Sequence, residues 1–113
     1  MKINLLDCTL RDGGYYNNWD FDDKIILEYA KSMEKLPIDY IEVGYRSIQL
    51  NTYLGKFFYC PEFLLRRLKK IMPTKNIVIM LNEKDLSKEN INSLLTPIQS
   101  YVKMIRVAVN PKN

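Results

Sequence analysis

Four short runs of apolar residues recur along the chain, at residues 3–6, 40–43, 77–81 and 104–109. Each run is rich in β-branched residues or leucine, and apolar and polar positions hardly alternate within it. That pattern is typical of parallel strands that are covered on both faces. The runs therefore predict a buried parallel β-sheet.

Amphipathic patterns separate these runs and predict three helices. The first has aspartates ahead of an apolar stripe over residues 25–33, and it ends before a proline. Pro61 is suited to the first turn of the second helix, which Pro73 stops. Ser87 caps the third, and Pro97 ends it or begins a short extra turn. The resulting order is βαβαβαβ, with the spacing of right-handed crossovers.

Two architectures fit four parallel strands: a small open, doubly wound sheet, or the first half of an eightfold barrel. A complete barrel needs at least about 200 residues, so the barrel interpretation makes this chain of 113 residues a partial one. The sequence stops directly after the fourth predicted strand, where a covering helix should follow. We therefore expect one domain over residues 1–113 that is truncated after that strand. Residues 44–59 form the longest irregular stretch, and its many aromatic side chains suggest a functional loop or an interface.

Composition narrows the class of protein. With 47% hydrophobic and 27% charged residues, the chain resembles an ordinary globular domain. The net charge is +4, and its densest basic cluster, within residues 66–70, falls on the polar face of the second predicted helix. We interpret this cluster as a solvated face and expect no nucleic-acid partner.

The apolar runs and the two cysteines give further expectations, about the compartment and about zinc binding. The first apolar run leaves no room for a signal peptide, and no run approaches membrane-spanning length, so we expect a cytoplasmic protein without a membrane partner. Cys8 and Cys60 lie in no CxxC pair, and the chain has no histidine, which argues against a structural zinc site. Cys8 is expected to be an inert small hydrophobe within the first strand.

Charge and glycine gather directly after the first apolar run. Arg11 and Asp12 would lie at the carboxyl end of that strand, where parallel α/β sheets place their chemistry. Gly13 and Gly14 would then let the backbone turn sharply. Taken alone, Arg-Asp-Gly favours a surface ion pair before a turn over a functional site.

A second motif gives these residues a context. The sequence DCTLRDGG at residues 7–14, followed by IEVG at 41–44, resembles the opening of the DRE-type TIM-barrel metallolyases. That family includes 3-hydroxy-3-methylglutaryl-CoA lyase, isopropylmalate and homocitrate synthases, and 4-hydroxy-2-oxovalerate aldolase. The continuation GGYYNNWDF at 13–21 looks most like a poorly characterised aldolase-catalytic-domain branch. The resemblance covers the whole chain and implies the N-terminal half of a (β/α)8 barrel.

The resemblance also implies roles for individual residues. Asp12 would bind a divalent metal, Mg²⁺ or Mn²⁺, and Arg11 would steady an enolate oxygen. Glu42 would orient Arg11 or a metal-bound water, or would only fix Arg11 in a buried ion pair. The family's other metal ligands are a His-x-His pair on a late strand, which this chain lacks, so metal affinity is expected to be weak or absent in the chain alone. Tyr15 stands where the aldolases have a histidine base, and a neutral tyrosine is a poor base.

Other candidates lie at or near the predicted strand ends. Arg106 stands alone in an apolar strand, which favours an inward ion pair or a contact with an anion. Tyr16 and Trp19 either shape the pocket or pack the first loop over it. The candidate substrate-binding residues are Tyr45, Arg46, Asn82 and Arg106.

The resemblance implies that the full-length parent protein is a metal-dependent carbon–carbon lyase or aldolase acting on small 2-oxo or 3-hydroxy acids through an enolate. Condensation of an acyl-CoA with a 2-oxo acid is a sister possibility. A non-catalytic sugar- or phosphate-binding module, with Arg11, Arg46 and Arg106 holding an anion, is the alternative. A response-regulator-like sheet is disfavoured, because the first strand lacks an acidic pair. The chain alone is expected to show no turnover and to self-associate as an oligomer or aggregate through its free sheet edges.

Overall fold

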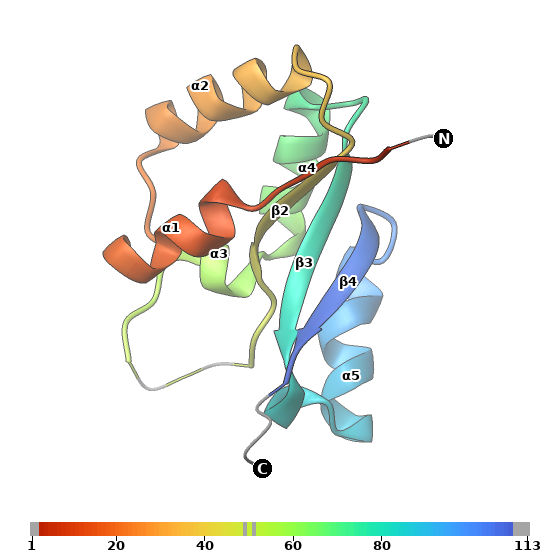
Figure 1. The fold of residues 1–113 in the computed structure, drawn as a ribbon. Helices are drawn as coiled ribbons and strands as arrows, with labels where there is room; N and C mark the ends of the chain where they lie inside the picture. The colour runs from red at the N-terminus through yellow and green to blue at the C-terminus, as the bar shows by residue number, and fades with distance from the viewer. Residues whose placement is uncertain (1–2, 49, 51, 110–113) are drawn as a thin grey trace.

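The computed structural model describes residues 3–48, 50 and 52–109. In this part of the chain a parallel sheet has the strand order β1-β2-β3-β4 (Figure 1). Its strands are β1 (Leu6–Asp7), β2 (Tyr40–Tyr45), β3 (Asn76–Asn82) and β4 (Val102–Ala108). The order never reverses, so the sheet lacks the switch point of a doubly wound fold. The predicted βαβαβαβ arrangement is confirmed, and its winding is that of a (β/α)8 barrel.

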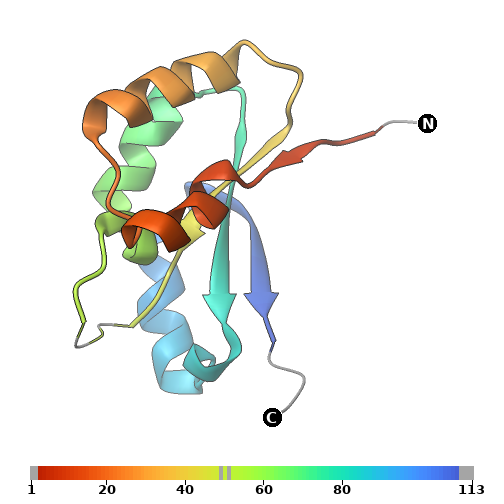
Figure 2. The ribbon, with the colours of Figure 1, turned by 60° about the vertical axis from the view of Figure 1, so that its left-hand side comes forward.

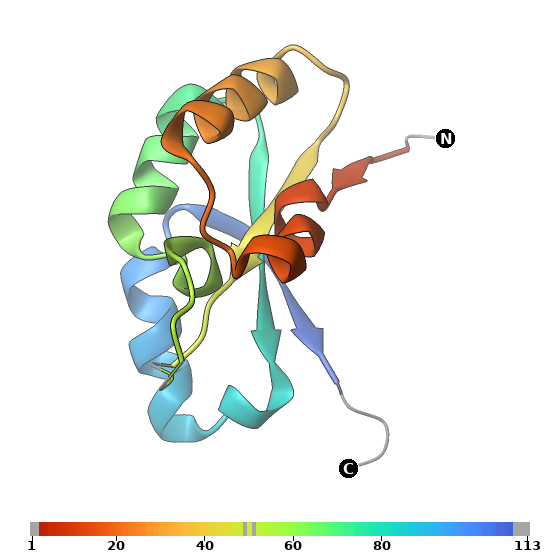
Figure 3. The same ribbon diagram turned by 90° about the vertical axis from the view of Figure 1, so that its left-hand side faces the viewer.

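Three helices connect the strands: α2 (Asp23–Glu34), α4 (Glu62–Ile71) and α5 (Lys88–Leu95). They lie on one face of the sheet (Figure 3). The predicted caps are present, since Asp22 accepts a hydrogen bond from the Lys24 amide and Ser87 accepts one from Asn90. After α5 the short 3₁₀ turn η2 (Thr96–Ile98) contains Pro97, as the sequence allowed.

The core lies between the sheet and these helices. Ile41 and Val43 of β2 and Ile77 and Ile79 of β3 are fully buried there, and burying each such side chain stabilises the fold by about 1.5–3 kcal/mol. The helices contribute Ala30, Leu64, Leu65 and Leu68. The prediction that each strand is covered on both faces is confirmed for β2 and β3. It is wrong for the outer strands β1 and β4, whose side chains are mostly exposed or half-buried because these strands form the edges.

The segment after β1 departs most from expectation. Residues predicted to turn sharply instead form the helix α1 (Thr9–Asn17), and none of the chain's glycines in the described part has a positive φ angle. Asp7 starts this helix, because its carboxylate accepts hydrogen bonds from the Thr9 amide and hydroxyl. The Tyr29 hydroxyl of α2 also donates to Asp7. Helix α1 then packs against β2 (Figure 2).

The aromatic stretch over residues 44–59 is less irregular than predicted. Its first two residues belong to β2, and its last four form the short helix α3 (Lys56–Tyr59). A second 3₁₀ turn, η1 (Glu83–Asp85), follows β3. Residues 110–113, with which the predicted truncation was argued, lie outside the described residues. No helix in the described part is both long and apolar enough to span a bilayer.

Candidate active site

An irregularity in β2 decides which side chains reach the face of the sheet opposite the helices. Glu42 pairs with Val78 of β3, but the next pairs are Gly44 with Ile79 and Tyr45 with Met80, so one residue of β2 is skipped. Side chains alternate between faces along a strand, and an extra residue reverses the alternation beyond it. Glu42 and Tyr45 consequently share one face.

Gly44 is placed on the helix side by the same irregularity. A Cβ atom there would lie 2.0 Å from the carbonyl oxygen of Phe57, so only glycine allows α3 to approach β2 this closely. The register extends the opposite face to β4, because Met80 also pairs with Arg106 and Asn82 with Ala108. Tyr45, Arg106 and Asn82 therefore lie on the same face as Glu42.

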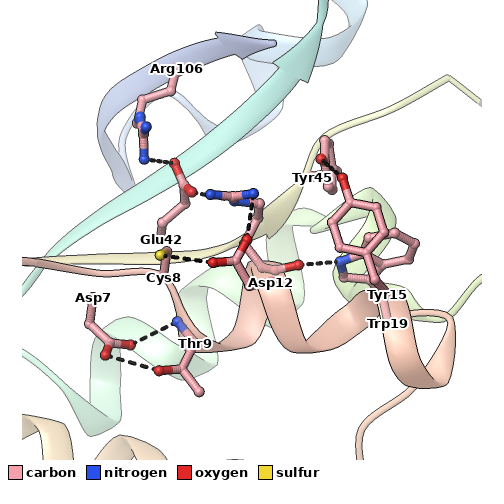
Figure 4. Close-up of polar contacts among 10 residues, drawn as sticks. Asp7, Cys8, Thr9, Asp12, Tyr15, Trp19, Glu42, Tyr45 and Arg106 are labelled. Carbon is pink, nitrogen blue, oxygen red and sulfur yellow. Dashed lines mark hydrogen bonds and ion pairs between the residues drawn. The ribbon is translucent and has the colours of Figure 1, made fainter.

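Glu42 is the centre of an ion-pair network on this face (Figure 4). Its side chain is completely buried. Arg11 Nε of α1 donates to Glu42 Oε1 at 2.6 Å, and Arg106 Nη1 of β4 donates to Oε2 at 3.1 Å. Burial by itself would lower the pKa of Arg11, but the hydrogen bond and charge of Glu42 outweigh it and raise that pKa. Arg11 is thus a fixed cation, and the predicted ion pair with Glu42 is present.

Asp12 lies at the exposed end of this network. Arg11 Nη1 is 2.7 Å from Asp12 Oδ1, and the Cys8 thiol donates to Oδ2 at 3.2 Å. The Asp12 side chain is 58% exposed, whereas that of Arg11 is 16% exposed. The placement of Cys8 within a buried strand is wrong: Cys8 follows β1, is half-buried and contacts the candidate metal ligand. The hydrogen bond to Asp12, and then burial, raise the pKa of this thiol.

Tyr15 and Tyr45 form a second polar contact beside the arginine network. Their hydroxyl oxygens are 2.5 Å apart, and either can be the donor. Burial, and then the hydrogen bond with Tyr15, raise the pKa of Tyr45 to about 12. Tyr45 is therefore neutral at physiological pH, and it holds the phenol of Tyr15, whose residue is 61% exposed.

Arg46 does not join this group. Because it follows the irregularity in β2, its side chain points to the helix side, where Nε donates to the Leu94 carbonyl at 2.7 Å and Nη1 to the Tyr59 carbonyl at 3.1 Å. Burial lowers the pKa of Arg46. Its donors connect β2 to α3 and α5, so we leave it out of the candidate site. Asn82 is the last residue of β3 and lies on the same face as Glu42, but within the described residues the ion-pair network of Glu42 does not extend to it.

The structure also adds Cys8 to the site, a residue whose part there the sequence did not indicate. Cys8 and Asp12 are four residues apart, a spacing that would have paired them had a helix been predicted. Trp19 was expected either to shape the pocket or to pack over it, and its packing against Tyr15 and Tyr45 is now evident.

The described residues do not form a metal centre by themselves. No three His, Cys, Asp or Glu side chains in this part of the chain gather closely enough to hold an ion. Both carboxylate oxygens of Asp12 already have partners, and a hard divalent cation needs about six oxygen ligands. Asp12 could supply one of them.

One solved structure matches this arrangement closely. The crystal structure of the N-terminal domain of a putative aldolase from Bacteroides vulgatus covers 98% of this chain with a TM-score of 0.92 and 54% sequence identity. This chain is a close homologue of that domain. It spans 37% of the matched chain's length. No family model matches the sequence, and a comparison with curated proteins found no match.

Proposed function

We propose that this chain forms part of the active site of an aldolase or lyase that breaks carbon–carbon bonds in 2-oxo or 3-hydroxy acids through an enolate. The observation that carries the proposal is the Arg11 guanidinium, which buried Glu42 fixes beside the exposed carboxylate of Asp12. Homology to the domain of a putative aldolase supports the same reaction class.

Arg11 would stabilise the charge that develops when the bond breaks. The electron pair of the broken carbon–carbon bond becomes an enolate, whose negative charge resides mainly on oxygen. A guanidinium has five N–H donors and does not deprotonate in proteins. Glu42 and Asp12 each take one donor in the described contacts. Tyr45 lies within reach of a further Arg11 donor, and a remaining donor would bind the enolate oxygen. A cation already held in place needs little reorganisation when the charge forms.

Tyr15 would handle a proton in this reaction. A neutral phenol is a weak base, but it can donate a proton to the carbon atom of an enolate. Its hydroxyl is held by that of Tyr45, which keeps the donor in one place. We therefore assign Tyr15 as the candidate acid and Tyr45 as the group that orients it.

Arg106 would hold the carboxylate of the oxo acid. Its side chain is 40% exposed and uses one terminal nitrogen for Glu42 in the described contacts. A planar guanidinium matches a carboxylate with paired hydrogen bonds. Arg11 and Arg106 face the two carboxylates of Glu42 and Asp12, so the charges of the network balance, and an anionic substrate would be held by the exposed part of the Arg106 guanidinium.

A divalent metal, Mg²⁺ or Mn²⁺, belongs to the proposal through Asp12 alone. Such an ion would polarise the substrate carbonyl. We expect weak or no metal binding by the isolated chain, because one carboxylate is too few ligands. The remaining ligands would have to come from outside the described residues.

The reaction class can be tested by enolisation of pyruvate. With Mn²⁺ present, the full-length protein that contains this chain should exchange the methyl protons of pyruvate for deuterium, as measured by NMR. Asp12→Asn should reduce the exchange rate at least about 100-fold, because it removes the carboxylate proposed to hold the metal that polarises the substrate carbonyl. Asp23→Asn is the control, since Asp23 pairs with Lys56 on the surface. No exchange, or no loss in Asp12→Asn, would reject the proposal.

Two other functions have less support. Condensation of an acyl-CoA with a 2-oxo acid would use the same enolate chemistry, and product analysis with acetyl-CoA would reveal it. The phosphate- or sugar-binding module required Arg11, Arg46 and Arg106 together, but Arg46 faces the helices. Calorimetry of the chain with phosphate would test it, and binding that Arg106→Gln abolishes would favour this alternative.

A further inference from the structure

Trp19 has an unusual backbone conformation at the end of α1. Its φ angle is 57°, and that of the preceding Asn18 is 55°. Left-handed backbone is unfavourable for a bulky aromatic residue, so surrounding contacts must hold it there. Trp19 is only 6% exposed, which places the indole inside the fold.

The indole of Trp19 is in contact with the helix that carries the candidate site. Trp19 Nε1 donates to the carbonyl oxygen of Arg11 at 2.9 Å. The ring covers Gly14, where a Cβ atom would lie 1.9 Å from Trp19 Cδ1. Its ring centre is 4.7 Å from that of Tyr15 and 5.4 Å from that of Tyr45 (Figure 4). A single side chain therefore contacts the backbone of Arg11 and the rings of both tyrosines.

The backbone around Trp19 is attached to a different part of the fold. The Phe57 amide donates to the Trp19 carbonyl at 3.3 Å, and the Gly55 amide donates to the Asn18 carbonyl at 2.7 Å. Phe57 belongs to α3, which lies directly against Gly44 of β2. Through these bonds the end of α1 is fixed relative to β2, the strand that carries Glu42.

We propose that Trp19 is a positioning residue for the candidate site. It sets where α1 lies along β2, and so where Arg11, Asp12 and Tyr15 meet Glu42 and Tyr45. The proposal deepens the proposed function and rests on it for its chemical consequence. Its structural part, the placement of α1, can be measured independently of any reaction.

Hydrogen exchange tests the placement directly. In Trp19→Phe the ring still packs, but the hydrogen bond to the Arg11 carbonyl is lost. Amides of α1 should then exchange at least about tenfold faster, with β3 amides unchanged, because α1 opens locally. Tyr53→Phe is the matched control, since it removes the hydrogen bond from Tyr53 to Asp20 in the same region without touching α1. Unchanged α1 exchange, or equal acceleration throughout the chain, would overturn the proposal.

A second variant covers the case in which Trp19→Phe does not fold. Trp19 is the only tryptophan of the chain, so growth on benzothienylalanine replaces it selectively with two fused rings that lack the N–H donor. This analogue should accelerate exchange in α1 in the same way. If the analogue leaves α1 exchange unchanged, the hydrogen bond does not position the helix.

Catalysis gives the readout that a purely structural role would not alter. In the full-length protein, Trp19→Phe should lower kcat for pyruvate exchange at least about tenfold per folded molecule, with KM changed less than about twofold, because misplaced groups stabilise the transition state less. An unchanged kcat would overturn the catalytic part of the proposal. If the unmodified protein exchanges no pyruvate protons, the proposed function fails, while α1 exchange still decides whether Trp19 positions the helix.

Discussion

At the scale of single residues, Glu42 decides how charge is arranged on the face of the sheet opposite α2, α4 and α5. Its carboxylate is completely buried and pairs with arginines from two distant segments, Arg11 and Arg106. Burying a charge is costly unless it is paired and hydrogen-bonded. The sequence left open whether Glu42 only fixes Arg11 or also orients a metal-bound water. The contacts show that it pairs with both arginines, and its role toward a bound water stays a prediction.

Glu42→Gln should lower the free energy of unfolding by about 3 kcal/mol, because it leaves two guanidinium groups without their buried counter-charge. Urea unfolding of the chain measures this. Asp23→Asn is the control: its ion pair with Lys56 is largely exposed, so the loss should be at most about 1 kcal/mol. Equal losses in the two variants would mean that the Glu42 network contributes no more than a surface pair.

At the scale of elements, α1 is the segment on which sequence and structure disagree. Two adjacent glycines normally weaken a helix and favour a turn. Here the Asp7 carboxylate accepts hydrogen bonds from Thr9, the first residue of the helix, and Trp19 packs over Gly14 at its other end. Tertiary contacts therefore override the local preference, and they place Arg11 and Asp12 on a helix rather than on a strand end.

The two glycines of α1 should respond oppositely to alanine. Gly14→Ala should destabilise the chain by about 1–3 kcal/mol, because the new methyl group would overlap the indole of Trp19. At Gly13 a Cβ atom would meet only Phe21, at 3.8 Å, so Gly13→Ala should stabilise the helix by about 0.5–1 kcal/mol. Thermal or urea unfolding distinguishes them, and a stabilising Gly14→Ala would contradict the observed packing.

At the scale of the whole molecule, the sheet has two free edges. In the described residues β1 pairs only with β2, and β4 only with β3. Apolar side chains are exposed along both edges, including Leu6 on β1 and Ile105 and Val107 on β4. Unpaired strands with apolar side chains are sites of association. The predicted self-association of the chain therefore remains an expectation with a structural basis.

Sedimentation velocity of the chain should show association that increases with concentration. The double variant Ile105→Thr/Val107→Thr should weaken it at least about tenfold, because it makes the β4 edge more polar. Ile25→Thr is the control, since Ile25 is also apolar and is more exposed than Ile105 and Val107 but lies on α2. A stable monomer at all concentrations would contradict the expectation.

The sequence by itself determined the elements whose signals are local. Apolar runs predict β2, β3 and β4, while aspartate, serine and proline mark the ends of α2, α4 and α5. These features depend on neighbouring residues, so they can be read without the fold. The motif around Arg11 and Asp12, together with Glu42, likewise identified three side chains that the structure brings together.

Only the tertiary structure decided how the site is assembled. The residue skipped in β2 turns Tyr45 toward Glu42 and Arg46 toward the helices, and regular alternation along the strand would have done the opposite. The pairing of β3 with β4 brings Arg106 to Glu42, and the packing of Trp19 makes a helix of a glycine-containing segment. Each of these outcomes depends on contacts between residues far apart in the sequence, and local patterns carry no information about such contacts.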